Sequence, residues 1–559
     1  MQASSNPQQK NAASNAAAKS HRSFFSKPQN IALAILAVAL IGIAVVWLKT
    51  GMHPSSPKSE LPIKAQNELP PDAPEPEFIL NQCIIKYAAD ASVAEKQAVR
   101  EAFKAELKQE LISQVGAASG ANTGASVELI QFSTDDQVAT DARSMKKATL
   151  NVISKISQDR RVLYAEPNYV IRAADSKYSS NDPLYVQGKL WGLQTKSQGT
   201  AASIRGQLTP TTKPRGRITA VPTASSLRAS ADKPIPNPGG ISIKSTVNSK
   251  SATAANITYS QYSTHADQAW ASGHIGSDDV YVGVVDSGIQ YDHPDLARNF
   301  ERSASKDFYN IAGHEELFSA DENPHGTHVA GIIAAVGGNG LGTTGIAWKA
   351  RIIEAKFLGS DGKGDTAAAV QAIAYLTDLK LKKKINIVAI NASWVSYAPS
   401  EILLDAIKEA GKANILLIAA AGNESYNADK YKPYPASYDT SITTSKTKTP
   451  GIGYNSIISV AAIQPDGQLA SFSNYGKTTV QLAAPGTNIW STWPKNDYHA
   501  DSGTSMAAPH VTGAALLYAA SHPQASASEI RSAILSKVMK VPSLSGKVES
   551  GGTLDVSTF

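Results

Sequence analysis

Residues 280–286 read VYVGVVD, a nearly unbroken apolar run that ends in an acidic residue. Four similar runs follow it, with helical segments between them: ARIIEAKFL at 350–358, INIVAINASW at 385–394, NILLIAAAGN at 414–423 and SIISVAAI at 456–463. Apolar strands that alternate with helices are typical of a parallel sheet that is covered on both faces. The sequence therefore predicts a three-layer α/β domain with a mostly parallel central sheet, within residues 180–559.

Length and composition limit what the rest of the chain can be. The 559 residues are 42% apolar and 18% charged, which indicates a large globular domain with attachments. The single cysteine, Cys83, excludes an intramolecular disulfide framework, cysteine-cluster zinc fingers and cysteine-ligated iron–sulfur sites. A net charge of +6 over this length is mild, so we expect no nucleic-acid partner.

The N-terminus predicts a membrane anchor. Residues 1–30 form a polar leader with four basic and no acidic side chains, and residues 31–48 read IALAILAVALIGIAVVWL. Eighteen helical residues span about 27 Å, close to the hydrocarbon core of a bilayer. The positive flank predicts a cytoplasmic N-terminus with the remaining chain outside. A cleaved signal peptide is the alternative. Residues 49–76, rich in Pro, Ser and Glu, predict a linker.

Two further segments precede the large domain or interrupt it. Residues 77–175 predict a small α+β domain with strands at 78–87, 126–133 and 161–173 and helices at 91–112 and near 148–159. Residues 196–258 are rich in Ser, Thr, Ala, Pro and Gly, with nine basic residues and one acidic residue. We interpret them as a low-complexity basic insertion, either a solvated loop or a segment that docks on an acidic surface.

Four polar residues lie at the ends of predicted elements. Asp286 and Asn423 end strands, while His325 and Ser505 begin segments of small residues typical of helices. A serine hydroxyl needs a base to become nucleophilic, an imidazole titrates in the range to serve as that base, and a carboxylate fixes the imidazole's tautomer. The Asn423 amide and the Ser505 backbone N–H are candidate donors to the oxyanion that develops.

With these motifs the chain resembles the subtilisin-like serine proteases (subtilases, peptidase S8 family). The order Asp, His, Ser, the segments HGTHVAGIIAAV at 325–336 and SGTSMAAPHVTGAALL at 502–517, and NDPLYVQGKLWGLQ at 181–194 carry the resemblance. It implies a serine endopeptidase that hydrolyses protein or peptide substrates through an acyl-enzyme. Asp286, His325 and Ser505 would form the triad, and Asn423 would lie in the oxyanion hole.

Residues 77–175 resemble the inhibitory propeptide of the same family (inhibitor I9-like), most specifically in LYAEPNYVIRA at 163–173. This resemblance implies a zymogen whose propeptide assists folding and caps the active site until it is removed. We expect the self-processing cut between Val170 and Ser180. The peptidase would then be membrane-anchored on the extracytoplasmic side, or secreted after processing.

The resemblance also implies metal and substrate sites. A structural calcium ion would be bound by the side chains of Asp295 and Asn339, by three carbonyls in the loop VGGNGLGTTG and by one further ligand. Those carbonyls belong to Val336, Leu341 and Thr343, and the further ligand is Asp182. An ordinary glycine-rich turn is the alternative.

Substrate should lie as an extended strand between two edges, around Gly362–Gly364 and around Ser393–Val395. Ser393, Trp394, Val395 and Gly422 would surround the primary specificity pocket. The family usually has glycine where Val395 stands, so we expect the β-branched side chain either to narrow the pocket or to shift the approach of the substrate backbone. A catalytically silent binding protein and a membrane adaptor that acts through residues 196–258 are the alternative functions.

Overall fold

The structure is a computed structural model that describes residues 76–112, 126–133, 142–174, 190–193, 260–309, 323–446 and 448–559. The predicted leader, the apolar segment 31–48, nearly all of the linker and the insertion 196–258 lie outside the described residues. Among the residues described, no helix has both the length and the hydropathy that a bilayer crossing requires.

A nine-stranded sheet forms the centre of the large domain, in the order β16-β17-β13-β12-β11-β9-β5-β7-β6. All neighbouring strands are parallel except β16 and β17. The prediction of a mostly parallel sheet is confirmed. The strands are β5 (Gly276–Val284), β6 (Lys306–Asp307), β7 (Lys349–Lys356), β9 (Ile387–Ala392), β11 (Leu416–Ala420), β12 (Ile457–Ile463), β13 (Leu482–Pro485), β16 (Met539–Lys540) and β17 (Gly552–Thr553).

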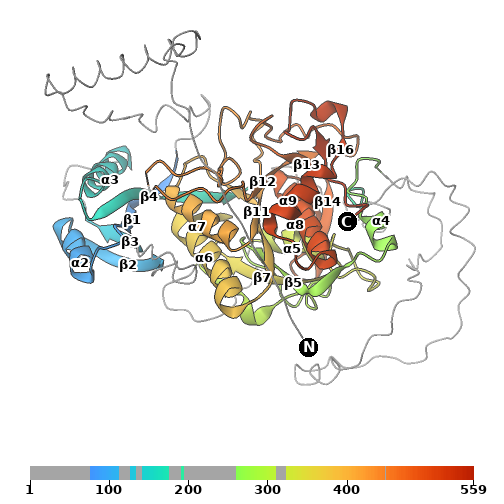
Figure 1. Cartoon of the computed structure of the whole chain (residues 1–559), viewed down its shortest axis with the longest axis horizontal. Helices are drawn as coiled ribbons and strands as arrows, with labels where there is room; N and C mark the ends of the chain where they lie inside the picture. The colour runs from blue at the N-terminus through green and yellow to red at the C-terminus, as the bar shows by residue number, and fades with distance from the viewer. Residues whose placement is uncertain are drawn as a thin grey trace, which may run out of the picture. The chain divides into compact units, whose positions relative to one another are not determined.

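Helices cover both faces of this sheet (Figure 1). One face packs on α6 (Thr366–Lys383) and α7 (Glu401–Lys412), and the other packs on α5 (His325–Ala334), α8 (Thr504–Ser521) and α9 (Ala527–Ser536). Strand β11 shows why its sequence is apolar throughout. Leu416 and Ile418 pack in the core with α8, while Leu417 and Ala419 pack in the core with α6 and α7. Alternate side chains point to opposite faces, and both faces are buried.

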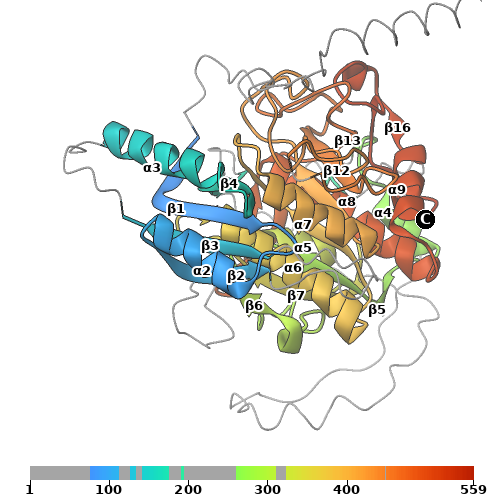
Figure 2. The ribbon, with the colours of Figure 1, turned by 60° about the vertical axis from the view of Figure 1, so that its left-hand side comes forward.

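The smaller domain is built on a second sheet, in which β10-β4-β1-β3-β2 are neighbours and β8 also pairs with β4. Its own strands are β1 (Phe78–Tyr87), β2 (Ala105–Ile112), β3 (Val127–Phe132) and β4 (Val162–Ala173), whereas β8 (Lys363–Asp365) and β10 (Trp394–Val395) belong to the large domain. Helices α2 (Val93–Ala102) and α3 (Ala142–Ile156) pack on one face, where Cys83 is buried. The other face packs against α6 and α7 (Figure 2).

The predicted helix at 91–112 is wrong in its second half. Helix α2 ends at Ala102, and Lys104 adopts a left-handed conformation with φ of 50°. Residues from Ala105 onward form β2 and pair antiparallel with β3. The charged side chains there suit an edge strand, because charge at an edge discourages pairing with other chains. Tertiary pairing therefore overrides the local helical propensity.

The remaining elements flank the large sheet. They are α4 (Ala266–Ala271), η5 (Arg302–Ala304), η6 (Pro542–Leu544) and the hairpin β14 (Ile489–Trp493) with β15 (Asp497–Asp501). The hairpin fastens α5, because Ser491 Oγ donates to His328 O at 2.6 Å and Thr492 Oγ1 donates to Thr327 O at 2.7 Å. Gly331 permits this contact, since a Cβ there would lie 2.2 Å from Thr492 Oγ1. Hydrogen bonds from this hairpin, which lies outside the central sheet, therefore fix the helix that begins at His325.

Candidate active site

A carboxylate and an imidazole meet at the carboxyl ends of the central strands. Asp286 follows β5, and His325 is the first residue of α5. His325 Nδ1 lies 2.6 Å from Asp286 Oδ1, and both side chains are buried. The Ser287 N–H also donates to Asp286 Oδ1 at 2.7 Å. An imidazole whose Nδ1–H donates to a carboxylate keeps Nε2 as the nitrogen that accepts a proton.

A serine and an amide converge on one carbonyl oxygen, that of Ala174. Ser505 lies in the first turn of α8, and its Oγ is 2.6 Å from Ala174 O. Asn423 Nδ2 donates to the same oxygen at 2.5 Å. A Cβ at Gly503 would lie 3.0 Å from this oxygen and 3.3 Å from Asn423 Nδ2. Glycine at 503 therefore leaves room for a carbonyl between the hydroxyl and the amide.

Thr504 fixes the orientation of the Asn423 amide, a role that sequence reasoning missed. Both the N–H and the hydroxyl of Thr504 donate to Asn423 Oδ1 at 2.9 Å. The Thr504 hydroxyl in turn accepts the Gly422 N–H at 3.0 Å. The amide oxygen is thus engaged, and the amide nitrogen faces Ala174. The sequence signal that could have indicated this role was the position of Thr504 directly before Ser505.

The end of β4 lies as a middle strand between two edges of the large domain. Arg172 pairs antiparallel with Lys363 of β8 on one side and with Val395 of β10 on the other. The Ala173 N–H donates to Gly362 O at 2.9 Å, and the Ala174 N–H donates to Ser393 O at 3.1 Å. The two predicted edges thus flank residues 170–174, with Gly364 opposite Ile171.

The predicted pocket residues play different parts. Ser393 Oγ donates to Ser505 O at 2.9 Å, and Val395 is buried in the same apolar cluster as Ala174. Gly422 has φ of 98°, a backbone conformation that favours glycine. The Trp394 indole is fully buried and donates to Val285 O at 3.0 Å. Its backbone faces Ala173, but its side chain belongs to the core.

A buried lysine supports the carboxylate segment, and sequence reasoning missed it as well. Lys356, at the end of β7, is 1% exposed. Its Nζ donates to Ser287 O and, at 2.8 Å, to Leu358 O. Ser287 is the residue that donates to Asp286, and its hydroxyl accepts the Gly326 N–H at 3.0 Å. The lysine therefore anchors the link between the Asp286 and His325 segments.

The predicted calcium loop is closed by its own hydrogen bonds. Asp295 Oδ1 accepts from Asn339 Nδ2 at 2.6 Å, and Oδ2 accepts from the Thr343 N–H at 2.9 Å. Asn339 Oδ1 accepts from the Leu341 N–H at 2.9 Å, and the Val336 N–H donates to Asp295 O at 2.8 Å. Calcium requires several oxygen ligands, whereas N–H donors meet both carboxylate oxygens here. The calcium site therefore stays a prediction, and Asp182, its further ligand, lies outside the described residues.

The small domain also caps two helices of the large one. Glu166 Oε1 accepts from Ser400 Oγ at 2.5 Å, and Oε2 accepts from the Glu401 N–H at 3.2 Å, at the start of α7. Asn168 Oδ1 accepts from the Ala367 N–H at 3.1 Å in the first turn of α6. Burial raises the pKa of Glu166 to about 7, although the two donors at the start of α7 lower it. The contacts satisfy backbone N–H groups that a helix leaves open.

Comparison with known proteins agrees with this geometry. The model of the Subtilase family (Peptidase S8) matches residues 277–552. Subtilisin DY of Bacillus licheniformis is 34% identical over 284 residues, which cover 51% of this chain and 92% of that protein. Thermitase of Thermoactinomyces vulgaris is 34% identical over 51% of this chain and 88% of its own length.

A third relative is the major intracellular serine protease of Bacillus subtilis (strain 168). It is 36% identical over 255 residues, which cover 45% of this chain and 72% of that protein. The matched region contains the strand ends and helix starts that carry the four polar residues described above. This chain therefore belongs to the subtilase family and is a subtilisin-like serine endopeptidase.

Proposed function

We propose that the chain is made as a zymogen that cuts itself between Ala174 and Asp175. The observation that carries the proposal is the position of the Ala174 carbonyl oxygen, 2.6 Å from Ser505 Oγ and 2.5 Å from Asn423 Nδ2. The Ser505 hydroxyl and the Asn423 amide both lie next to this peptide carbonyl, as expected of the peptide bond that the serine attacks. The cut falls within the interval predicted from the sequence.

In the proposed reaction, Ser505 Oγ attacks the Ala174 carbonyl carbon while His325 takes the hydroxyl proton. Asp286 holds the imidazole and stabilises its positive charge. The Asn423 amide and the Ser505 backbone N–H stabilise the negative oxygen. His325 then gives the proton to the leaving amine of Asp175, and an ester joins Ala174 to Ser505. Water hydrolyses that ester through the same base.

Residues 76–174 then remain as an inhibitor in this proposal. After the cut, residues 170–174 would keep their pairing with β8 and β10 and occupy the groove where another substrate would lie. The caps that Glu166 and Asn168 provide would hold the small domain on α7 and α6. The peptidase would become active when this domain dissociates or is degraded.

The proposed location of the enzyme is supported by the sequence alone. We propose that residues 31–48 anchor the zymogen in a membrane with the peptidase domain on the extracytoplasmic side. Because the cut lies beyond the anchor, the peptidase would leave the membrane once the propeptide releases it. Its substrates would be extracytoplasmic proteins or peptides.

Mass spectrometry of the full chain tests the proposal. Wild type should yield a new N-terminus at Asp175, while Ser505→Ala should stay intact. The extent of cleavage should not depend on protein concentration, because nucleophile and carbonyl belong to one molecule. Addition of wild-type enzyme to the Ser505→Ala chain separates self-cleavage from cleavage by a neighbour. A new N-terminus elsewhere, or equal cleavage of both chains, would contradict the assignment.

A further inference from the structure

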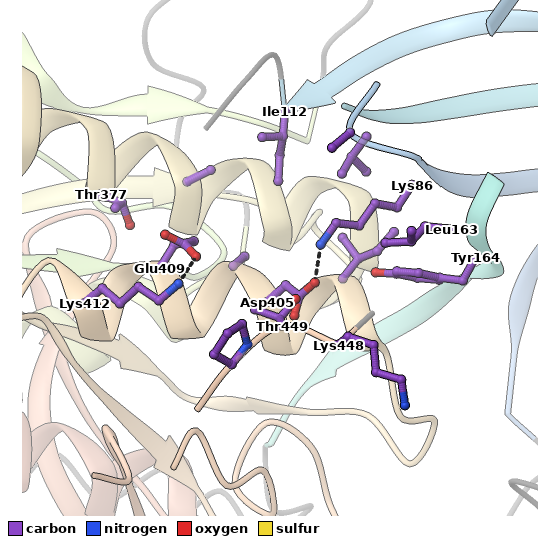
Figure 3. Close-up of a pocket in the computed structure, with 16 residues that line it drawn as sticks. Lys86, Ile112, Leu163, Tyr164, Thr377, Asp405, Glu409, Lys412, Lys448 and Thr449 are labelled. Carbon is purple, nitrogen blue, oxygen red and sulfur yellow. Dashed lines mark hydrogen bonds and ion pairs between the residues drawn. The ribbon is translucent and has the colours of Figure 1, made fainter. Parts of the chain in front are cut away.

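Two cavities lie along β4, one beside its first residues and one beside its last. The first, of about 310 Å³, is lined by Leu163 and Tyr164 together with helices α6 and α7, and the ion pair between Lys86 and Asp405 lies in its wall (Figure 3). The second, of about 200 Å³, lies beside Arg172 near the end of β4. This second cavity opens on the groove where a substrate strand is expected, so its walls bear on what the enzyme cleaves.

The wall of the second cavity is shared between β4 and the large domain. Val170 and Arg172 contribute from β4, and alternate residues such as these point to the same side of a strand. The large domain contributes, among others, Val395, Tyr397, Glu424 and Tyr426. In the proposed cut between Ala174 and Asp175, Arg172 is the third residue before the scissile bond. The cavity therefore lies where the side chain of a substrate's third residue would lie.

Glu424 supplies a carboxylate to this cavity, and two neutral donors hold it there. Tyr397 Oη donates to Glu424 Oε2, and Asn474 Nδ2 donates to the same oxygen at 2.9 Å. Asn474 is fully buried, and its Oδ1 accepts the Glu424 N–H at 3.2 Å and the Tyr426 N–H at 2.7 Å. Burial, followed by the charge of Glu424, raises the pKa of Tyr397 well above its usual value, so the hydroxyl remains a donor. The carboxylate is thus positioned without a positive charge.

The charge of Glu424 is available to a substrate. Among the residues that the structure describes, Glu424 forms no ion pair, its Oε1 accepts no hydrogen bond, and its side chain is exposed. Arg172 pairs instead with Glu77 of the small domain at 2.6 Å, and both of these side chains are about half exposed. Glu77 would leave the groove together with the small domain, whereas Glu424 would remain.

We propose that the active enzyme prefers a basic side chain, Lys or Arg, at the third residue before the scissile bond, and that Glu424 selects it. This inference rests on the proposed function, which places residues 170–174 as a substrate would lie. The carboxylate would pair with the cationic group, while the rings of Tyr397 and Tyr426, 6.1 Å apart, would pack against its aliphatic stem. Because the pair would be partly exposed, the gain is modest, up to about fivefold in kcat/KM.

The test compares kcat/KM for fluorogenic peptides, using enzyme obtained from the full wild-type chain. The parent peptide is VIRAADSK, the sequence of residues 170–177, and in matched peptides Arg is replaced by Lys, by its neutral isostere citrulline or by Glu. At low salt, the Arg and Lys peptides should be cleaved about fivefold better than the citrulline peptide, and the Glu peptide should be poorest. The Arg-to-citrulline ratio should approach one at high salt, because salt screens an exposed ion pair.

Variants locate the charge that selects the substrate. Glu424→Gln should reduce the Arg-to-citrulline ratio to about one, and Glu424→Lys should favour the Glu peptide instead. Glu409→Gln is the matched control, because it removes one negative charge on α7 beside the other cavity (Figure 3) and should leave the ratio as in wild type. A further peptide, with Lys directly before the scissile bond and citrulline at the third position, tests whether Glu424 binds the nearer side chain.

Equal cleavage of the Arg and citrulline peptides by wild type would overturn the proposal, as would a ratio that persists in Glu424→Gln or is lost in Glu409→Gln. An effect of Glu424→Gln confined to the peptide with Lys directly before the bond would also overturn it, as would a cut of the parent peptide anywhere but between Ala and Asp. The wild-type ratio and its salt dependence suffice if a Glu424 variant does not fold. The ratio is measured on free peptides and the zymogen is tested by the new N-terminus of the chain, so the two proposals fail separately.

Discussion

Glu166 should make the association of the small domain, the proposed propeptide, with the large domain sensitive to pH. Its carboxylate is nearly buried and caps the start of α7 through Ser400 and the Glu401 N–H. Burial raises its pKa from 4.5 to about 7, while the charge of Lys446 lowers it and that of Glu401 raises it. Tyr164 and Tyr438 also face this carboxylate. The assembled pair therefore favours the protonated acid.

The magnitude follows from the difference between the two pKa values. In a separated propeptide the side chain would be exposed and keep its ordinary pKa of 4.5. Between pH 4.5 and about 7, association then takes up a proton, so affinity falls about tenfold per pH unit. The full contribution is present below pH 4.5 and is lost as pH rises to about 7, with a total loss of up to about 300-fold.

Retention of the propeptide measures this effect without relying on turnover. The self-cleaved full chain is immobilised through a C-terminal tag and washed at pH values from 4.5 to 8, and the retained propeptide is quantified. Glu166→Gln is the matched control, because its amide oxygen still accepts a hydrogen bond but does not titrate. Wild type should lose propeptide as pH rises while the variant stays flat. Equal slopes, or wild-type retention that increases with pH, would refute the reasoning.

Four further predictions concern single side chains. Thr504→Val should lower kcat for a peptide substrate about tenfold with KM nearly unchanged, because the Asn423 amide loses a hydroxyl that orients it, while Thr504→Ser should retain activity. Val395→Gly should broaden cleavage to larger side chains before the scissile bond, and an unaltered profile of cleaved peptides would contradict this. Lys356→Met should reduce the free energy of unfolding by about 2–4 kcal/mol in a denaturant titration, because two buried carbonyls lose their donor, with Lys356→Arg as the milder control. Asn339→Ala should lower the free energy of unfolding by about 1–2 kcal/mol in the same titration, since Asp295 and Leu341 lose a partner.

Local sequence patterns predicted the elements that carry the chemistry. The continuous apolar runs could be interpreted because strands buried on both faces have no polar face to interrupt them, as β11 shows. Asp286, His325, Asn423 and Ser505 stood out because their residue types and their positions at element ends fit one reaction. The structure brings all four to one end of the sheet, with the Asp286–His325 pair at 2.6 Å.

Contacts between segments that are distant in the sequence could not be predicted from local sequence patterns. Residues 105–112 were predicted as the second half of a helix but form β2, because β3 supplies backbone hydrogen-bond partners that no local pattern indicates. Trp394 was expected around the specificity pocket, yet its indole is directed into the core by Val285 O. Thr504 was marked only by its position beside Ser505, and its partner Asn423 is remote in the sequence. Lys356 gave no signal of its own, since its acceptors Ser287 O and Leu358 O come together only in the folded chain.

The sequence by itself therefore determined the family, the layered parallel fold and the types of residue available for catalysis. Hydrophobic periodicity and the order of the motifs can be recognised in the sequence without any knowledge of long-range contacts. Only the tertiary structure decided which peptide carbonyl meets Ser505 and Asn423, which domain caps α6 and α7, and where a cavity forms between the domains. Each of these depends on the pairing of β4 with β8 and β10, strands separated from it by about 190 to 230 residues. Such long-range pairing is selected by the burial of whole faces, a property of the assembled chain rather than of any segment in it.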